Sequence, residues 1–339
     1  MRSTMLRRFG GVLAFAAIAA AVGGCPKEQP SDTAGGGPAG GGGGAAGKQL
    51  TIAVMPKGTK HQFWQAVKAG ADQACKEENC TVDWAGPANE GSINDQVNLV
   101  ETKITGKVDG IVLAATDATA LNKPLLDAKA KGIPVVTIDS GVTDKDASLA
   151  YIATDNVEGG RRAAEALAKA MGEKGKVGLL IFQKGSASSD DRQKGFEEGI
   201  KKYPGIQLVS TLEANDPQKA TETTLNMLTA HPEITGIFAA NEPNGVGSAN
   251  ALKQKGLAGK VKLVAYDSST EEIKALQDGI IQATIVQDPF QMGYKGVKTV
   301  LNAIRKKPIS EKFINSGMTV VTKDNLNTPD VQKLVNPSK

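Results

Sequence analysis

The sequence contains few histidines, cysteines and aromatic residues. Its 339 residues include two histidines and three cysteines, and only 4% are Phe, Trp or Tyr. His61 has no partner at a metal-ligand spacing, and neither a histidine nor a second cysteine pair completes a zinc site with Cys75 and Cys80. The sequence therefore predicts neither a metal nor a cofactor.

Long hydrophobic runs are also lacking. The apolar run at residues 11–22 spans about a dozen residues, whereas a membrane-spanning helix needs roughly 20. Arg2, Arg7 and Arg8 precede this run, and small residues lead from it to Cys25. This order indicates an export signal. It resembles a bacterial lipoprotein signal, which implies cleavage before the cysteine and lipidation of Cys25; a simple secretory signal cleaved nearby is the alternative.

The segment after the signal has no large apolar side chain. Residues 25–48 are dominated by Gly, Ala, Pro, Ser and Thr, and such a sequence cannot bury enough surface to offset the entropy of ordering. We predict a flexible tether at residues 25–48, after a signal peptide at residues 1–24. Without residues 1–24, which hold three arginines and no acidic residue, the formal charge of +4 becomes +1. No basic excess or recognition motif then indicates binding to nucleic acid.

The two remaining cysteines are close in sequence. In an exported protein, where disulfides persist, Cys75 and Cys80 are predicted to form one. The closed loop would be very small, so its stabilisation should lie at the low end of the usual range. Free thiols are an alternative, whereas C-x-x-x-x-C does not have the spacing of a redox pair.

The rest of the chain shows a regular alternation of two kinds of segment. Short β-branched runs alternate with amphipathic stretches, which is typical of parallel sheets covered by helices. About 290 residues are enough for two cores, so we predict an α/β fold with two doubly wound lobes. The predicted strands are 50–56, 81–85, 109–115, 133–140, 177–183, 206–212, 234–240, 261–267 and 281–287. The predicted helices include 62–78, 94–105, 159–171, 191–203 and 217–230.

The two halves of the sequence echo each other weakly. VDGIVLAATD at residues 108–117 is similar to ITGIFAANE at residues 234–242, and IPVVTID ending at Asp139 is similar to VKLVAYD ending at Asp267. Two similar lobes are therefore expected.

Polar residues lie at or just after the ends of many of the predicted strands. Ligands of open α/β sheets bind outside the carboxyl ends of the strands, and carboxylates, amides and guanidinium groups suit a ligand rich in hydroxyls. Phe63 and Trp64 could pack against the C–H face of a sugar ring. Each polar residue alone could be a helix cap or turn former, but their convergence on one edge favours a binding site. The set is Lys57, Asp139, Arg192, Asn241, Glu242, Asp267 and Gln287.

From residue 50 onward, the chain resembles the periplasmic sugar-binding proteins of ABC importers, of the ribose- and galactose-binding type. The resemblance implies a periplasmic-binding-protein type I fold, in which two Rossmann-like lobes joined by hinge strands close around a sugar, and a membrane permease as partner. It also implies an N-terminal lobe at 49–154 plus 288–316 and a C-terminal lobe at 155–287 plus 317–339. The matching segments are TIAVMPKGTKHQFWQAVKAGA from Thr51, DGIVLAATDATAL from Asp109, GIPVVTIDS from Gly132, IATDNVEGG from Ile152, DRQKGFEEGI from Asp191, LTAHPEITGIFAANE from Leu228, LVAYDSS from Leu263 and ATIVQDPFQMGYKGV from Ala283.

The resemblance assigns roles to several of these residues. It makes Phe63 and Trp64 the aromatic contacts, and Asp139 and Asp267 the carboxylates that accept hydrogen bonds from sugar hydroxyls. The second-lobe donors and the hinge-side amide are Arg192, Asn241 and Gln287.

Four positions of the predicted site depart from the ribose-binding pattern. Lys57 and His61 replace polar residues near the first strand, Ser140 replaces an arginine, and Asn215 replaces a second-lobe aromatic residue. These differences argue against ribose itself and leave room for a larger, modified or anionic sugar.

Two other classes of protein with this architecture are disfavoured. A dehydrogenase would need G-x-G-x-x-G after the first strand, and a repressor would need a helix-turn-helix and would not be exported. We therefore expect a monomeric binding protein rather than an enzyme. The alternative function is that of a sensor, which presents its ligand to a chemoreceptor or binds a quorum signal.

Overall fold

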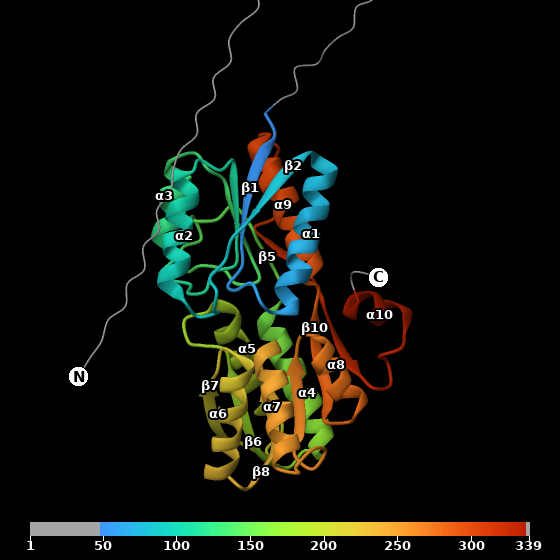
Figure 1. The fold of residues 1–339 in the computed structure, drawn as a ribbon. Helices are drawn as coiled ribbons and strands as arrows, with labels where there is room; N and C mark the ends of the chain where they lie inside the picture. Colours follow the sequence, from blue (N-terminus) through green and yellow to red (C-terminus); the bar gives the residue numbers. More distant parts are fainter. Residues whose placement is uncertain (1–47, 337–339) are drawn as a thin grey trace, which may run out of the picture. The chain divides into compact units, whose positions relative to one another are not determined.

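The computed structural model describes residues 48–336, which form two α/β lobes, each built on a six-stranded sheet (Figure 1). The predictions for Cys25, for the signal peptide and for residues 25–47 of the tether lie outside the described residues. Within the described residues, no helix has the length and apolar character needed to cross a membrane.

The N-terminal lobe, in the upper part of Figure 1, is composed of strands β1 (Leu50–Met55), β2 (Cys80–Trp84), β3 (Gly110–Leu113), β4 (Val135–Ile138), β5 (Tyr151–Ala153) and β11 (Phe313–Asn315), and helices α1 (Gln62–Glu78), α2 (Ile93–Thr105), α3 (Asn122–Ala130) and α9 (Pro289–Ile304). The strand order is β2-β1-β3-β4-β5-β11, and each neighbouring pair is parallel. Helices α1 and α9 cover one face of the sheet, and α2 and α3 cover the other.

The C-terminal lobe is composed of strands β6 (Gly175–Ile181), β7 (Ile206–Glu213), β8 (Ile234–Ala239), β9 (Lys262–Tyr266), β10 (Ile281–Gln287) and β12 (Met318–Thr322), and helices α4 (Asn156–Met171), α5 (Ala187–Ile200), α6 (Pro217–Ala230), α7 (Glu242–Gln254), α8 (Thr270–Gln277) and α10 (Pro329–Val335). The strand order is β7-β6-β8-β9-β10-β12, and only β12 is antiparallel to its neighbour. Helices α4 and α5 pack on one face, and α6, α7, α8 and α10 pack on the other.

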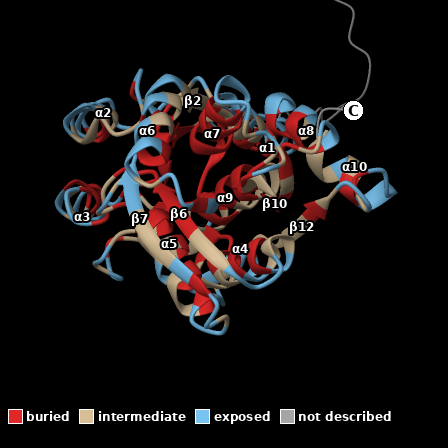
Figure 2. Cartoon of the chain, turned by 90° about the horizontal axis from the view of Figure 1, so that it is seen from below, coloured by how far each residue is buried: buried red, intermediate tan, exposed pale blue. Residues whose placement is uncertain are grey.

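Apolar strand sequences explain why both faces of each sheet are covered. In β1, Ile52 and Val54 face the cluster that includes α1 and α9, whereas Ala53 and Met55 face the cluster that includes α2 and α3. Alternate residues of a strand point to opposite faces, so a continuous apolar run requires helices on both sides. Figure 2 shows the result, with buried residues on the inner helix faces and inner strands, and mostly intermediate or exposed residues on the edge strand β7 and on the outer surface.

The α/β fold with two sheets is confirmed, and the predicted strands agree with the observed ones to within two residues at each end. Two details of the predicted helices were wrong. The helix predicted at 191–203 begins at Ala187 and ends at Ile200, because Ser188 and Ser189, residue types that favour caps and turns, form its buried first turn. The helix predicted from residue 159 begins at Asn156, after the capping side chain of Asp155.

The chain passes between the two sheets three times. It leaves the N-terminal sheet after β5, returns after β10, and leaves again after β11. Thr154 in the first of these connections donates a hydrogen bond to the carbonyl of Gly317 in the last, at 3.2 Å. The hinge is therefore made of neighbouring connections that are far apart in sequence.

Pairs of helices approach each other closely at glycines. A Cβ at Gly195 of α5 would lie 1.9 Å from the carbonyl oxygen of Val157 in α4, and one at Gly70 of α1 would lie 2.0 Å from that of Phe290 in α9. Only a residue without a side chain permits this separation.

A disulfide joins the end of α1 to the start of β2. It links Cys75 and Cys80, whose Cα atoms are 4.6 Å apart. Asn79 between them ends the helix in a left-handed conformation with φ of 54°, which asparagine tolerates better than most residues.

Candidate functional site

A cavity between the two lobes is lined by residues that follow the carboxyl ends of strands in both sheets. Most of the predicted site residues lie there: Lys57, His61, Phe63, Trp64, Asp139, Arg192, Asn241, Asp267 and Gln287. Glu242, which the sequence also predicted at a strand end, lines the cavity as well, and the other lining residues are Glu90, Phe182, Ser188, Ser189, Ala240 and Pro243. The cavity volume is about 40 Å³.

Asp139 and Asp267 occupy equivalent places in the two lobes. Asp139 follows β4 with φ of 56°, and Asp267 follows β9 with φ of 84°. Both values lie in the left-handed region, which few residues other than glycine adopt and in which aspartate is enriched. Backbone strain of this kind concentrates at functional sites, so the repeated geometry supports a common role for the two carboxylates.

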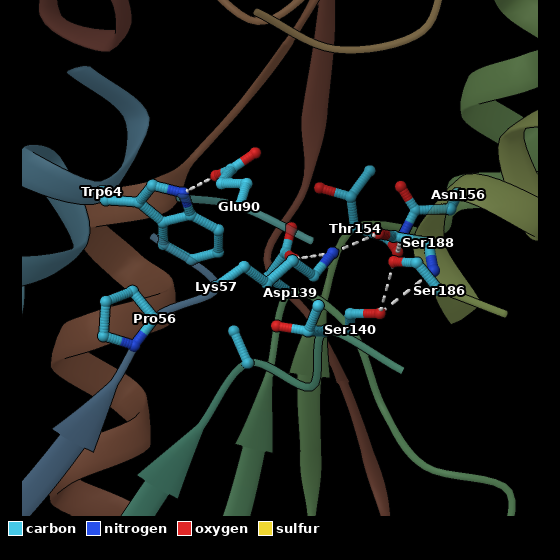
Figure 3. A network of polar contacts seen from close by, with 12 residues as sticks. Pro56, Lys57, Trp64, Glu90, Asp139, Ser140, Thr154, Asn156, Ser186 and Ser188 are labelled. Carbon is cyan, nitrogen blue, oxygen red and sulfur yellow. Dashed lines mark hydrogen bonds and ion pairs between the residues drawn. The ribbon is translucent and has the colours of Figure 1, made fainter. Parts of the chain in front are cut away.

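Lys57 forms a buried ion pair with Asp139. The ammonium lies 2.9 Å from Asp139 Oδ2 and donates to Ser188 Oγ at 2.9 Å, as Figure 3 shows. It also lies 5.5 Å from the centre of the Phe182 ring. Because Ser188 and Phe182 belong to the C-terminal lobe, the Lys57 side chain bridges the two lobes.

Arg192 is held by neutral partners in the C-terminal lobe. Its Nε donates to Asn156 Oδ1 and its Nη1 to the carbonyl of Ala240, both at 2.8 Å. Its guanidinium lies 3.8 Å from the centre of the Tyr266 ring, an arrangement that favours a cation. Burial raises the pKa of Tyr266 to about 12. The guanidinium is thus fixed at the cavity wall without an ion pair among these contacts.

Asp267 is fixed by two donors. Its Oδ1 accepts from Gln287 Nε2 at 2.6 Å, and its Oδ2 accepts from the backbone N–H of Glu242 at 2.9 Å. Burial raises the pKa of Asp267. A carboxylate oxygen has two lone pairs, so each can still accept a hydrogen bond from a ligand.

Glu90 was missed by the sequence analysis. Its side chain is only 7% exposed, and it accepts a hydrogen bond from the indole N–H of Trp64. Burial raises the pKa of this carboxyl to about 7. Glu90 lies in the loop after β2, at the same sheet edge as the other site residues. Its position after a strand could have indicated a site residue. However, the loop has no apolar run from which the place of Glu90 relative to the sheet edge could be predicted.

His61 lies near two carboxylates that also line the cavity. Its Nε2 is 3.9 Å from Glu90 Oε2, and its Nδ1 is 3.9 Å from Glu242 Oε1. Burial lowers the pKa of His61 and raises that of Glu242 to about 7. Within residues 48–336 there is no cluster of three or more His, Cys, Asp or Glu residues able to hold a metal.

Two predicted residues do not line the cavity. Ser140 Oγ accepts from the backbone N–H of Ser188 at 3.2 Å and lies 3.5 Å from Ser186 Oγ, so it joins the lobes beside the cavity (Figure 3). Asn215 follows β7 and lies against the loop at Gly91, where a Cβ would be 2.9 Å from its Nδ2.

The other missed residues lie in the C-terminal lobe. Phe182 directly follows β6, but it lies inside the strand predicted at 177–183 and was therefore not predicted as a strand-end residue. Ser188 and Ser189 were missed because the helix was expected to begin after them. Their burial in the first turn of α5 places them on the cavity wall.

Carboxylates outnumber permanent cations around the cavity. Four line it, Glu90, Asp139, Glu242 and Asp267, against the side chains of Lys57 and Arg192. Lys57, the cation that the N-terminal lobe contributes, is already paired with Asp139. The site therefore offers more hydrogen-bond acceptors than free positive charge.

A comparison with protein families finds the one described as "Periplasmic binding protein domain", which matches residues 52–308. Among curated proteins, the D-allose-binding periplasmic protein of Escherichia coli K12 is 30% identical over 259 residues, covering 74% of this chain and 83% of that protein. The ribose import binding protein of the same strain is 30% identical over 267 residues, covering 78% and 88%.

Solved structures show the same likeness. A solute binding protein of an ABC transporter from Agrobacterium vitis, with bound D-fucose, has a TM-score of 0.82 and 37% identity, covering 84% of this chain and 99% of that one. A carbohydrate transporter solute binding protein from Agrobacterium radiobacter, in complex with D-arabinose, has a TM-score of 0.82 and 34% identity, covering 86% and 100%.

Proposed function

Because the chain belongs to the family of periplasmic binding protein domains, we propose that it captures a sugar between its two lobes and delivers it to the permease of an ABC importer. The observation that carries this proposal is the cavity itself, to which both lobes contribute polar residues from strand ends. The relatives are named as sugar-binding or sugar-import proteins, which favours import over a sensor role and binding over catalysis.

The proposed contacts follow from the geometry of the lining residues. Phe63 and Trp64 pack against the C–H face of the ring, while Asp139 and Asp267 accept hydrogen bonds from its hydroxyls. Ser189 Oγ and Gln287 Oε1 are buried and have no hydrogen-bond partner within residues 48–336, so a hydroxyl-bearing ligand would satisfy them. The proposed donors are Arg192, Asn241 and the side chain of Ser188.

An uncharged sugar fits the site better than an anionic one. Lys57 and His61 suggested an anionic ligand in the sequence, but Lys57 is paired with Asp139 and burial lowers the pKa of His61. A sugar acid would add a negative charge in the same surroundings, where burial raises the pKa values of Glu90 and Glu242 to about 7 and so disfavours their charged forms. We therefore propose a neutral, hydroxyl-rich ligand.

Entry of the ligand requires movement of the lobes or of Lys57. The cavity of about 40 Å³ is lined by side chains that are almost fully buried, among them Lys57, Asp139 and Arg192. Separation of the lobes at the hinge would break the contact between Lys57 and Ser188 and open the site. Closure around the sugar would then exclude water and strengthen its hydrogen bonds.

The same proposal extends to the location of the protein. We propose that it is exported and held at a bacterial membrane through a lipid on Cys25, with residues 25–48 as the tether. At about 5–6 Å times the square root of its length, such a linker lets the binding lobes move roughly 25 Å from the membrane. That range keeps the lobes close to a permease.

Thermal shift measurements with D-ribose, D-allose, D-arabinose, D-fucose and D-tagatose test the proposed function. A sugar present at about 100 times its Kd should add roughly 2.7 kcal/mol to the free energy of unfolding. D-Glucuronate and D-galacturonate should have no effect. If none of the neutral sugars raises the melting temperature, the proposed function is wrong.

Asp267→Asn tests the assigned site with the sugar that binds tightest. Asparagine tolerates the left-handed backbone of this position, so the fold should survive, while loss of the charged acceptor should weaken binding about tenfold. Unchanged affinity in this variant would place the site elsewhere.

Trp64→Phe should abolish any change in tryptophan fluorescence on binding, whereas Trp84→Phe, at the end of β2, should keep it.

A further inference from the structure

Helix α1 has no capping side chain of its own at its N-terminus. The first N–H groups of a helix lack partners within the helix, and the N-cap residue His61 makes no side-chain hydrogen bond to them. The backbone N–H groups of Trp64 and Gln65 reach the carbonyl of His61, at 3.1 and 3.3 Å. The other two N–H groups of the first turn, those of Gln62 and Phe63, have no acceptor within the helix.

The opposite lobe supplies the acceptors for these two groups. Gln62 N–H donates to Glu242 Oε1 at 3.1 Å, and Phe63 N–H donates to Glu242 Oε2 at 3.0 Å. Glu242 is the first residue of α7 in the C-terminal lobe and is only 7% exposed. A carboxylate at a helix N-terminus is also favoured by the helix dipole.

The capping is reciprocal. The side chain of Gln62 crosses in the other direction, and its Oε1 accepts from the N–H of Thr270 at 3.0 Å and from its hydroxyl at 3.1 Å. Thr270 is the first residue of α8. The Nε2 of Gln62 also donates to Glu271 Oε2 at 3.4 Å. Each lobe therefore caps a helix of the other.

We propose that Glu242 and Gln62 form a cross-lobe cap that holds the two lobes closed, and that Glu242 is a positioning residue for the aromatic wall of the site. The inference rests on the proposed function and deepens it by naming what couples closure to the binding surface. Phe63 and Trp64 lie in the turn that Glu242 caps, so separation of the lobes frees that turn at the same time as it opens the cavity.

The contacts distinguish this role from that of an ordinary ligand contact. Both oxygens of Glu242 are engaged by backbone N–H groups of the other lobe, and its own N–H is engaged by Asp267. Through these hydrogen bonds, Glu242 links the N-terminus of α1 to Asp267, one of the proposed sugar-binding carboxylates. Its substitution should change the closed state of the protein as well as the affinity.

Amide hydrogen exchange measured by NMR tests the cross-lobe cap directly. The exchange rates of the Gln62 and Phe63 amides are compared with and without D-ribose, D-allose, D-arabinose and D-fucose in turn. In the wild type, a sugar that binds should slow both amides at least about tenfold. In Glu242→Ala the same sugar should leave them fast and should bind about five- to tenfold more weakly, the usual effect of losing a helix cap.

Asp216→Ala is the matched control. Asp216 caps α6 within its own lobe, accepting from the N–H of Lys219 at 2.8 Å. Its loss should lower the melting temperature but leave sugar affinity and the exchange of Gln62 and Phe63 unchanged.

Gln62→Ala, which changes an exposed side chain, should fold normally and weaken sugar binding by a smaller factor than Glu242→Ala.

The outcomes separate the two proposals. If a sugar binds but the amides of Gln62 and Phe63 stay unprotected in the wild type, or are equally protected in Glu242→Ala, the cross-lobe cap is overturned while the binding function stands. If no sugar in the set binds, both fail. If Glu242→Ala does not fold, unchanged affinity in Gln62→Ala overturns the reciprocal cap.

Discussion

At the scale of single residues, the Lys57–Asp139 ion pair leaves the site with one free cation and one free carboxylate fewer. Lys57 is 5% exposed and Asp139 4% exposed, so each charge depends on the other for compensation. A buried ion pair adds little net stability, but loss of one partner leaves an uncompensated charge. The pair therefore matters mainly through the charge that the cavity presents to its ligand.

Lys57→Met should destabilise the protein by about 3 kcal/mol, because it leaves the Asp139 carboxylate buried without its cation. The double variant Lys57→Met/Asp139→Asn should recover most of this loss, since no net charge is then left at the pair. Urea unfolding of the two single variants and the double variant measures the coupling. Additive effects of the two substitutions would contradict the ion pair.

Glu90 should make stability depend on pH. Burial raises its pKa from 4.5 to about 7 in the folded protein. Its contribution to stability is fully present below the unfolded pKa, and is lost as the pH rises from about 4.5 through 7. The loss amounts to about 3 kcal/mol.

Glu90→Gln tests this dependence, because the amide keeps an acceptor for the Trp64 indole and does not titrate. Relative to the wild type, the variant should gain about 3 kcal/mol of unfolding free energy between pH 4.5 and pH 8. Urea unfolding across this range, without sugar, measures the difference. Glu242 is present in both proteins, so its own titration cancels. Parallel pH profiles would show that Glu90 ionises normally.

At the scale of elements, the strands with long apolar runs could be predicted and the short hinge strands could not. β5 and β11 have only three residues each, and β12 lies at the edge of its sheet with mostly half-buried residues. Their sequences carry too few apolar positions to show a period. These strands pair with their neighbours because the chain passes between the two sheets beside them, and this path depends on the whole fold.

The candidate site divides in the same way. Residues at the ends of predicted strands, such as Asp139 and Asp267, were found because the strand fixes their place at the sheet edge. Glu90 and Ser189 were missed because they lie in a loop and in an unexpected helical turn. The pairing of Lys57 with Asp139 also could not be predicted, since it depends on the direction of two side chains from different strands.

The helix pair α4–α5 should be sensitive to a single methyl group. Gly195→Ala should destabilise the protein by about 1–3 kcal/mol, because its Cβ would lie 1.9 Å from the carbonyl oxygen of Val157 and the helices must move apart. Gly141→Ala is the control, because its Cβ would make ordinary contacts of 3.6 Å with the Tyr151 ring. Equal melting temperatures for the two variants would contradict the close packing of α4 on α5.

At the scale of the whole molecule, the hinge and the tether impose different requirements. The lobes must open and close about three neighbouring connections, of which two, at 154–155 and 316–317, are linked by the bond from Thr154 to Gly317. The proposed tether would only have to keep the lobes near the membrane. Sugar binding should therefore be independent of the anchor, and the two can be tested separately.

Cys25→Ser should release the protein from the membrane without changing its sugar affinity. Expressed in a bacterium with its signal, the wild type should partition into detergent, because stable attachment requires buried acyl chains, and the mass of its mature N-terminus should include a lipid on Cys25. The serine variant should stay in the aqueous phase or keep its signal peptide. An unmodified Cys25 in the mature wild type would end the lipoprotein proposal and leave the simple secretory signal. Because residues 48–336 form the binding lobes without the tether, the thermal shift with sugar should be the same for both proteins.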